Sequence, residues 1–150
     1  MLQPAPENDY HPAFSATLLR SFAACLGRPL LRPATAQALY EAPFPVLAHN
    51  TADDPILTYG NRAAQQLWEL DWAALRQLPS RLTAEPGQRA ERAAMFDAMR
   101  QNGFADDYSG IRISATGQRF RIKNAIIWTL TNAAGVKIGE AATFKDYELL

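Results

Sequence analysis

The feature that most constrains the fold is the stretch from Phe120 to Thr131, in which apolar and polar side chains alternate. Successive side chains of a β-strand point to opposite faces, so this alternation predicts a strand with one face toward a core. The face predicted to be buried carries Phe120, Ile122, Asn124, Ile126, Trp128 and Leu130. The opposite face carries mainly Arg119, Arg121, Lys123, Thr129 and Thr131.

Turn-forming residues on both sides of this stretch predict a neighbouring strand on each side. A Thr116-Gly117 turn separates it from a strand over Tyr108–Ser114, and a turn over residues 132–135 leads to a strand from Val136 to about Tyr147. We therefore expect a three-stranded meander in the last third of the chain.

Two more strands are predicted ahead of the meander. Val46–Asn50 and Ile56–Tyr59 flank the sequence Asp53-Asp54-Pro55, whose residue types favour a tight turn. This segment is therefore expected to form a β-hairpin.

The remaining segments have helical spacing. Apolar residues recur every four positions from Phe14 to Leu26, and Gly27 follows as a C-terminal stop. Asn61 and Asp71 are residue types that cap helix N-termini. Further helices are predicted over about Pro33–Glu41, from Asn61 to Trp68, from Asp71 to Leu78 and from about Pro86 to Asn102.

This order of elements predicts an α+β fold of the PAS-like type. Two strands before the helices and three after them can form a five-stranded antiparallel sheet with helices on one face. Residues 1–45 are assigned to an N-terminal tail and helical extension, and residues 46–150 to the PAS-like domain.

Composition limits the partners and the compartment. The chain has 150 residues, 15 Lys and Arg against 15 Asp and Glu, and one cysteine, Cys25. A formal net charge of zero gives no long-range attraction to nucleic acid or to an anionic membrane, and it allows a homodimer without predicting one. No apolar run approaches the roughly 20 residues of a membrane span, and no secretory signal begins the sequence. We expect a cytoplasmic protein.

Several sequence blocks resemble the MEKHLA domain family. The resemblance covers nearly the whole chain, in the blocks Asp54–Ala64, Leu67–Glu69, Leu78–Pro86, Arg89–Arg92, Asp107–Ser114, Gly117–Ile122 and Ile138–Phe144.

This resemblance implies a PAS-like fold, which in plants lies at the C-terminus of class III homeodomain-leucine zipper regulators and in bacteria often forms a stand-alone chain. Because neither a homeodomain nor a zipper is present, the chain resembles the bacterial stand-alone form. The resemblance implies no particular ligand.

The residues that PAS-like domains need for bound cofactors are not in the expected places. Haem needs an axial ligand such as His, and the two histidines are His11 in the tail and His49 in the first strand. Flavin-adduct chemistry needs a reactive Cys on the helix after the second strand, where this chain has residues 61–66 without cysteine. Cys25 lies on the apolar stripe of a predicted helix. It is either a small buried hydrophobic residue or a redox switch. No cofactor is predicted.

Motifs of catalysis are also missing from the sequence. There is no G-x-S-x-G, no G-x-G-x-x-G, no P-loop and no paired Cys or His at metal spacing. The adjacent acids Asp53-Asp54 and Asp106-Asp107 fall in predicted loops, where aspartate commonly caps turns. We predict that the chain is not an enzyme, with a small cavity enzyme as the alternative.

A pocket between the sheet and the helices is the expected ligand site. Asn124 is the main candidate because a buried amide must find a hydrogen-bond partner, which is either a ligand or backbone and water. The aromatic and Met candidates are alternatively simple core residues. The predicted ligand-binding residues are Asn124, Trp128, Tyr59, Trp68, Arg81, Tyr108, Met95 and Met99.

Arginines allow two interpretations. Arg81 either binds an anionic ligand or forms a salt bridge with Glu85 or Glu91. The basic residues of the predicted strands either form a solvated patch or are covered by the N-terminal helices or a second subunit. These residues are Arg112, Arg119, Arg121 and Lys123.

We therefore predict a sensory or regulatory domain that binds a small molecule non-covalently and signals through protein–protein contacts. The alternative is a ligand-free dimerisation or docking module that uses the N-terminal helices or the sheet face.

Overall fold

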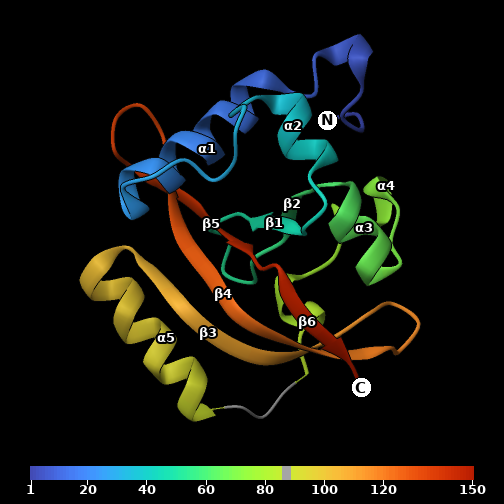
Figure 1. Cartoon of the computed structure of the whole chain (residues 1–150), viewed down its shortest axis with the longest axis vertical. Coiled ribbons are helices and arrows are strands. Elements are labelled where there is room, and N and C mark those ends of the chain that lie inside the picture. Colours follow the sequence, from blue (N-terminus) through green and yellow to red (C-terminus); the bar gives the residue numbers. More distant parts are fainter. Residues whose placement is uncertain (86–88) are drawn as a thin grey trace.

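The computed structural model describes residues 1–85 and 89–150, and the start of the helix predicted from Pro86 lies outside them (Figure 1). An antiparallel sheet runs in the order β2-β1-β5-β4-β3, with β6 also paired to β4. The strands are β1 (Val46–His49), β2 (Leu57–Gly60), β3 (Phe104–Ile113), β4 (Arg119–Thr131), β5 (Lys137–Thr143) and β6 (Asp146–Leu149). The predicted α+β fold with an antiparallel sheet is confirmed.

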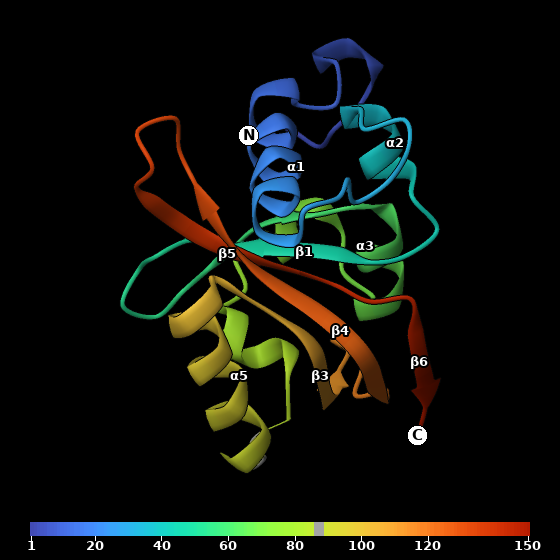
Figure 2. The same ribbon diagram turned by 60° about the vertical axis from the view of Figure 1, so that its left-hand side comes forward.

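Helices lie on both faces of this sheet. The helices are α1 (Pro12–Leu26), α2 (Ala36–Glu41), α3 (Arg62–Trp68), α4 (Trp72–Leu75) and α5 (Arg89–Asn102), with short 3-10 turns at Pro6–Asn8 and Ser80–Thr83. Figure 2 shows α1 and α2 on one side of the sheet and α5 on the other. The N-terminal extension therefore covers the sheet face that the PAS-like part leaves open.

The β4 strand contains a bulge at Asn124. Tyr108 of β3 pairs with Ala125, but Gly110 pairs with Ile122, so β4 has one extra residue between these pairs. Asn124 occupies the left-handed region with φ 52°, which Asn tolerates better than most residues. An extra residue bends a strand and turns the side chains beyond it to the opposite face.

The bulge corrects the prediction of a single buried face on this strand. Phe120 and Ile122 pack on the α5 side of the sheet, whereas Trp128 and Leu130 pack on the α1 side. Asn124 itself is exposed and does not interrupt a buried face, so the sequence-based placement of its amide in the core was wrong.

The last predicted strand is divided into two at the level of the bulge. β5 pairs with β4 up to Ile126–Thr143, and β6 resumes the pairing at Lys123–Asp146. Phe144 and Lys145 span the break opposite the extra residue, so the sheet has six strands where five were expected.

One apolar cluster holds α1 against the sheet. Phe22 packs edge-on against Trp128, with ring centroids 4.9 Å apart, and both side chains are fully buried. The indole Nε1 of Trp128 donates a hydrogen bond to the Leu18 carbonyl at 3.3 Å. The N-terminal helix is therefore part of the folded domain's core.

A second cluster lies between the sheet and the helices α3, α4 and α5. Trp68 packs edge-on against Phe120 at 5.1 Å, and its Nε1 donates to the Thr83 carbonyl at 3.2 Å. Met99 and Tyr108 are buried in the same cluster.

Asn61 is a fully buried polar residue that joins α2 and β1 to the start of α3. Its Oδ1 accepts from the backbone N–H of Val46 and of Ala64, and so caps α3 as predicted. Its Nδ2 donates to the carbonyls of Leu39 and Phe44. One amide thus fixes α2, β1 and α3 relative to one another.

Candidate functional site

An open cleft of about 570 Å³ lies between the C-terminal half of α5, the sheet and the loop that follows β1. Strands β1, β4 and β5 form its floor, α5 forms one wall, and residues 50–55 form the rim. This volume is in the range of small-molecule sites. The predicted position of a pocket, between the sheet and the helices, agrees with this cleft.

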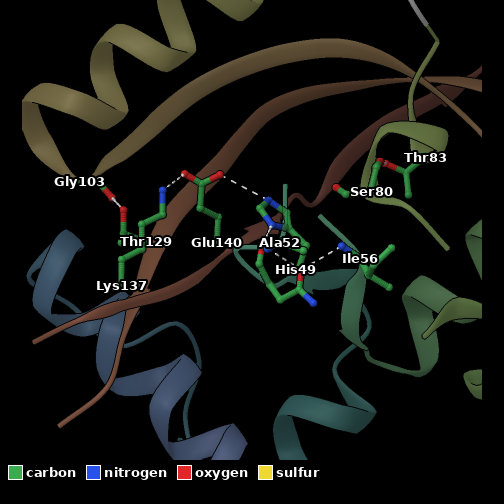
Figure 3. Close-up of polar contacts among 10 residues, drawn as sticks. His49, Ala52, Ile56, Ser80, Thr83, Gly103, Thr129, Lys137 and Glu140 are labelled. Carbon is green, nitrogen blue, oxygen red and sulfur yellow. Dashed lines mark hydrogen bonds and ion pairs between the residues drawn. The ribbon is translucent and has the colours of Figure 1, made fainter. Parts of the chain in front are cut away.

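The polar floor arises from strand register. His49 of β1 pairs with Glu140 of β5, and Glu140 pairs with Thr129 of β4, so three adjacent strands present these side chains in a row. The Thr129 hydroxyl donates to the carbonyl of Gly103, just after the end of α5, at 2.9 Å. Figure 3 shows these residues on the same side of the sheet.

Glu140 is bracketed by two basic side chains. Its Oε1 lies 3.4 Å from Nε2 of His49, and its Oε2 lies 3.1 Å from Nζ of Lys137 (Figure 3). The Glu140 and His49 side chains are largely buried, whereas Lys137 is half exposed. Both carboxylate oxygens are therefore compensated inside the cleft.

These contacts shift the acid–base properties of the pair. Hydrogen bonding from His49, aided by Lys137, lowers the pKa of Glu140 against the effect of burial. Desolvation is the largest single influence on His49 and lowers its pKa, but hydrogen bonds to Glu140 and to the Asn50 carbonyl, together with the negative charge of Glu140, outweigh it. The pKa of His49 is therefore raised, which favours the imidazolium ion beside the Glu140 carboxylate.

The rim loop is closed by the Asn50 side chain. Its Oδ1 accepts from the backbone N–H of Ala52 at 3.1 Å and of Ile56 at 3.0 Å, and its own N–H donates to the Ile56 carbonyl at 3.0 Å. The carbonyl of Asn50 is in turn 2.8 Å from Nδ1 of His49. His49 is thus fixed between the rim loop and β5.

The α5 wall of the cleft is mostly apolar. Phe96 is 43% exposed although it is a large aromatic residue, and Met99 extends from the cleft into the core. Arg100 lines the same wall and pairs with Asp97 on the exposed side of the helix. The cleft therefore combines an apolar wall with a charged and polar floor.

Of the eight residues predicted to bind a ligand, Met99 lines this cleft. Trp68 and Tyr108 lie on the same side of the sheet but are buried in the core, and Met95 is partly buried against that cluster. Their positions match the alternative prediction that these residues are simple core.

Tyr59 and Trp128 lie on the opposite side of the sheet, in the cluster beneath α1. The Tyr59 hydroxyl is buried and has no hydrogen-bond partner in the part of the chain that the structure describes. Burial raises the pKa of Tyr59. The sheet separates both residues from the cleft, so the prediction of one shared interior was wrong.

Asn124 and Arg81 are surface residues. Arg81 lies 3.2 Å from Asp54 in an exposed ion pair, and Glu85, one of its predicted partners, pairs with Arg119. The predicted salt-bridge role of Arg81 is correct in kind but has a different partner. The side chain of Glu91 lies outside the described residues.

Sequence reasoning missed the four polar floor residues, which are His49, Thr129, Lys137 and Glu140. Alternation with Leu47 would place His49 on the α5 side of its strand, and this was the available signal. The pairing of β1 with β5 joins residues about ninety positions apart, and the sequence alone does not define that register.

Residues 1–85 and 89–150 contain neither a membrane-spanning helix nor a metal-binding cluster. No helix in these ranges is long and apolar enough to cross a membrane. The same residues contain no group of three or more His, Cys, Asp or Glu side chains placed to hold a metal ion.

The fold is that of PAS and light-oxygen-voltage domains. A PAS domain from Colwellia psychrerythraea aligns with 74% of this chain and 92% of its own, at 12% identity and a TM-score of 0.62. A structure described as an RNA-binding light-oxygen-voltage receptor aligns with 73% of this chain at 22% identity and a TM-score of 0.61, and the match spans 31% of that receptor chain. A light-oxygen-voltage domain studied with a flavin analogue aligns with 77% of this chain and 83% of its own, at 12% identity and a TM-score of 0.59.

The chain belongs to the MEKHLA domain family, whose sequence model matches residues 12–149. The resemblance seen in the sequence blocks is thereby confirmed. The match begins at the start of α1, so the family domain includes the helix that packs against Trp128. No curated protein matches the chain.

Proposed function

We propose that this MEKHLA domain is a sensory or regulatory module that binds a small molecule non-covalently in the cleft between α5 and the sheet, and that signals through protein–protein contacts. The observation that carries the proposal is the cleft itself, where Phe96 stays exposed beside the partly buried polar row of His49, Glu140 and Thr129. Small-molecule sites combine apolar surface with converging polar groups. Both kinds of residue line this cleft, and the polar ones are in the majority.

The lining indicates the general chemistry of the ligand. Its apolar part would pack against Phe96, Met99 and Pro55, and its polar part would meet Lys137 and the Thr129 hydroxyl. Lys137 is half exposed, so it can leave Glu140 to contact a ligand without breaking the core. An amphipathic metabolite with an anionic or hydrogen-bonding end fits this arrangement.

The same strands connect the cleft to the N-terminal helices. Thr129 lines the cleft, while its neighbour Trp128 contacts α1 through Leu18 and Phe22. A ligand that prefers one packing of β4 over another would shift the population of α1 positions. The signalling surface on this proposal is the outer side of the N-terminal helices.

The proposed module performs no catalysis. Asp53 and Asp54 lie exposed in the rim loop, and Asp106 and Asp107 lie exposed on β3, where the sequence had predicted a loop. The zero formal charge favours a protein partner over nucleic acid or a membrane surface.

A ligand-free docking or dimerisation module is the second candidate. Strand β6 favours it, because Leu149 is 63% exposed and Tyr147 is half exposed at the outer edge of the sheet. In this case the β6 surface, and not the cleft, would determine self-association.

A thermal-shift screen of a metabolite library distinguishes the two candidates. A ligand that binds the native state raises the melting temperature. The hit should lose its effect in Phe96→Ala and keep it in Leu149→Ala, a matched loss of an exposed apolar residue outside the cleft. If no compound raises the melting temperature, and light scattering shows a dimer that Leu149→Ala dissociates, the second candidate is correct.

A further inference from the structure

His49 has both ring nitrogens facing hydrogen-bond acceptors. Nδ1 lies 2.8 Å from the backbone carbonyl of Asn50, and Nε2 lies 3.4 Å from Oε1 of Glu140 (Figure 3). A carbonyl oxygen only accepts, so Nδ1 must carry a proton in this contact.

The second contact then requires a second proton. A neutral imidazole with its hydrogen on Nδ1 directs the lone pair of Nε2 at the Glu140 carboxylate, which is repulsive. The imidazolium ion satisfies both acceptors. The two contacts of the His49 ring, with the loop and with the carboxylate, are therefore both satisfied when His49 is an imidazolium ion.

We propose that His49 is a proton-controlled latch that fastens the rim loop to β5 and so regulates access to the cleft. With the proton present, the ring joins Glu140 of β5 to the loop through the Asn50 carbonyl. After the proton is lost, one of the two contacts breaks and the loop is released. This proposal rests on the proposed function, because it concerns the regulation of the same site.

The charges from β5 set the working range of the latch. Glu140 stabilises the imidazolium, and Lys137 opposes it but is itself compensated by Glu140. The pKa of His49 is raised, mainly by its contact with Glu140, so the imidazolium persists to higher pH than in a free histidine.

The other elements around the ring contribute the paired charges of Arg100 and Asp54 and the exposed carboxylate of Asp53. Arg100 of α5 lines the cleft and pairs with Asp97. In the rim loop, Asp54 pairs with Arg81. Glu140 is therefore the acidic partner that contacts the ring, and it is the residue to change in a test.

NMR titration of the histidine ring carbons tests the electrostatic half of the proposal without any ligand. His11→Asn assigns the two histidine signals. The pKa of His49 should fall by about one unit in Glu140→Gln, because the carboxylate that stabilises the imidazolium is gone. In the matched variant Lys137→Gln the pKa should stay or rise, because a like charge has been removed. Equal His49 pKa values in wild type and Glu140→Gln would overturn the proposal.

Amide hydrogen exchange tests the mechanical half. The N–H of Ile56 is bonded to Asn50 Oδ1, so its protection factor reports closure of the loop. Protection should drop several-fold as pH rises through the His49 pKa and should not depend on pH in His49→Gln, which does not titrate. Protection that is constant across the titration in wild type would show that the loop is not released. Neither experiment requires ligand binding, so the cleft proposal can stand if the latch fails, and the latch can stand if no ligand is found.

Discussion

Trp128 and Thr129 are consecutive residues whose side chains lie on opposite faces of the sheet. Trp128 is fully buried beneath α1, and Thr129 forms part of the cleft floor next to α5. Any ligand that moves the backbone of β4 at Thr129 also moves the residue that holds α1. This link of a single peptide bond is the physical basis for the proposed signalling route.

Removing the aromatic contact beneath α1 should destabilise the whole domain. Phe22→Ala deletes a fully buried ring that packs edge-on against Trp128, and we expect a loss of about 3–5 kcal/mol in the free energy of unfolding. Urea denaturation followed by tryptophan fluorescence measures this loss. Val136→Ala, at an exposed apolar position, should change stability by less than about 0.5 kcal/mol. A Phe22→Ala loss as small as that of Val136→Ala would mean that α1 is not integral to the fold.

Asn61 should be the most sensitive polar residue of the core. Asn61→Ala leaves the N–H groups of Val46 and Ala64 and the carbonyls of Leu39 and Phe44 without their partner, for an expected loss of at least about 2 kcal/mol. Thermal and urea unfolding report the loss.

The matched control for Asn61 is Asp71, which caps α4 at the surface through the N–H of Ala74. Asp71→Ala should cost about 1 kcal/mol, because water can replace the lost hydrogen bond. Equal losses in the two variants would contradict the assigned role of Asn61 in joining α2, β1 and α3.

The backbone at Asn124 should govern which substitutions β4 accepts. Asn124→Gly should be neutral to slightly stabilising at this positive φ, whereas Asn124→Val should cost about 1–2 kcal/mol because a β-branched side chain is strained there. If both variants unfold at the same denaturant concentration, the bulge is not where the structure places it.

Stability should depend on pH through His49. The pKa of His49 is raised in the folded state, so the folded state binds the proton more tightly than the unfolded chain does. Its contribution to stability is therefore fully present below the unfolded pKa, about 6.5, and is lost as pH rises through the folded value. Urea midpoints of wild type and His49→Gln should differ more at pH 5.5 than at pH 8.5. A gap that widens toward alkaline pH would contradict the sign of this shift.

The sequence was sufficient for the order of the helices and strands, but not for the division of the last strand into β5 and β6 or for the faces of β4. Strands, hairpins and helices follow from spacing and turn residues, and the predicted cap at Asn61 is present. The bulge could not be predicted because the apolar residues of β4 keep a spacing of two, as on one face of a regular strand. These residues are Phe120, Ile122, Ile126, Trp128 and Leu130. The available sign of the bulge in the sequence was the presence of two apolar residues, Ala125 and Ile127, on the face predicted to be polar.

The cleft was predicted in position but not in composition. A pocket between sheet and helices follows from the element order, and Met99 follows from the helical pattern. The polar row of His49, Glu140 and Thr129 depends on non-local strand pairing, which local patterns do not define.

Native mass spectrometry of gently purified protein tests the central claim most directly. Wild type should retain a small molecule as an added mass. Ala52→Trp, which places a large ring at the exposed rim of the cleft, should lose it, and Ala24→Trp, on the outer surface of α1, should keep it. A bare protein mass in all three, together with no metabolite that raises the melting temperature of wild type, would contradict ligand binding in this cleft.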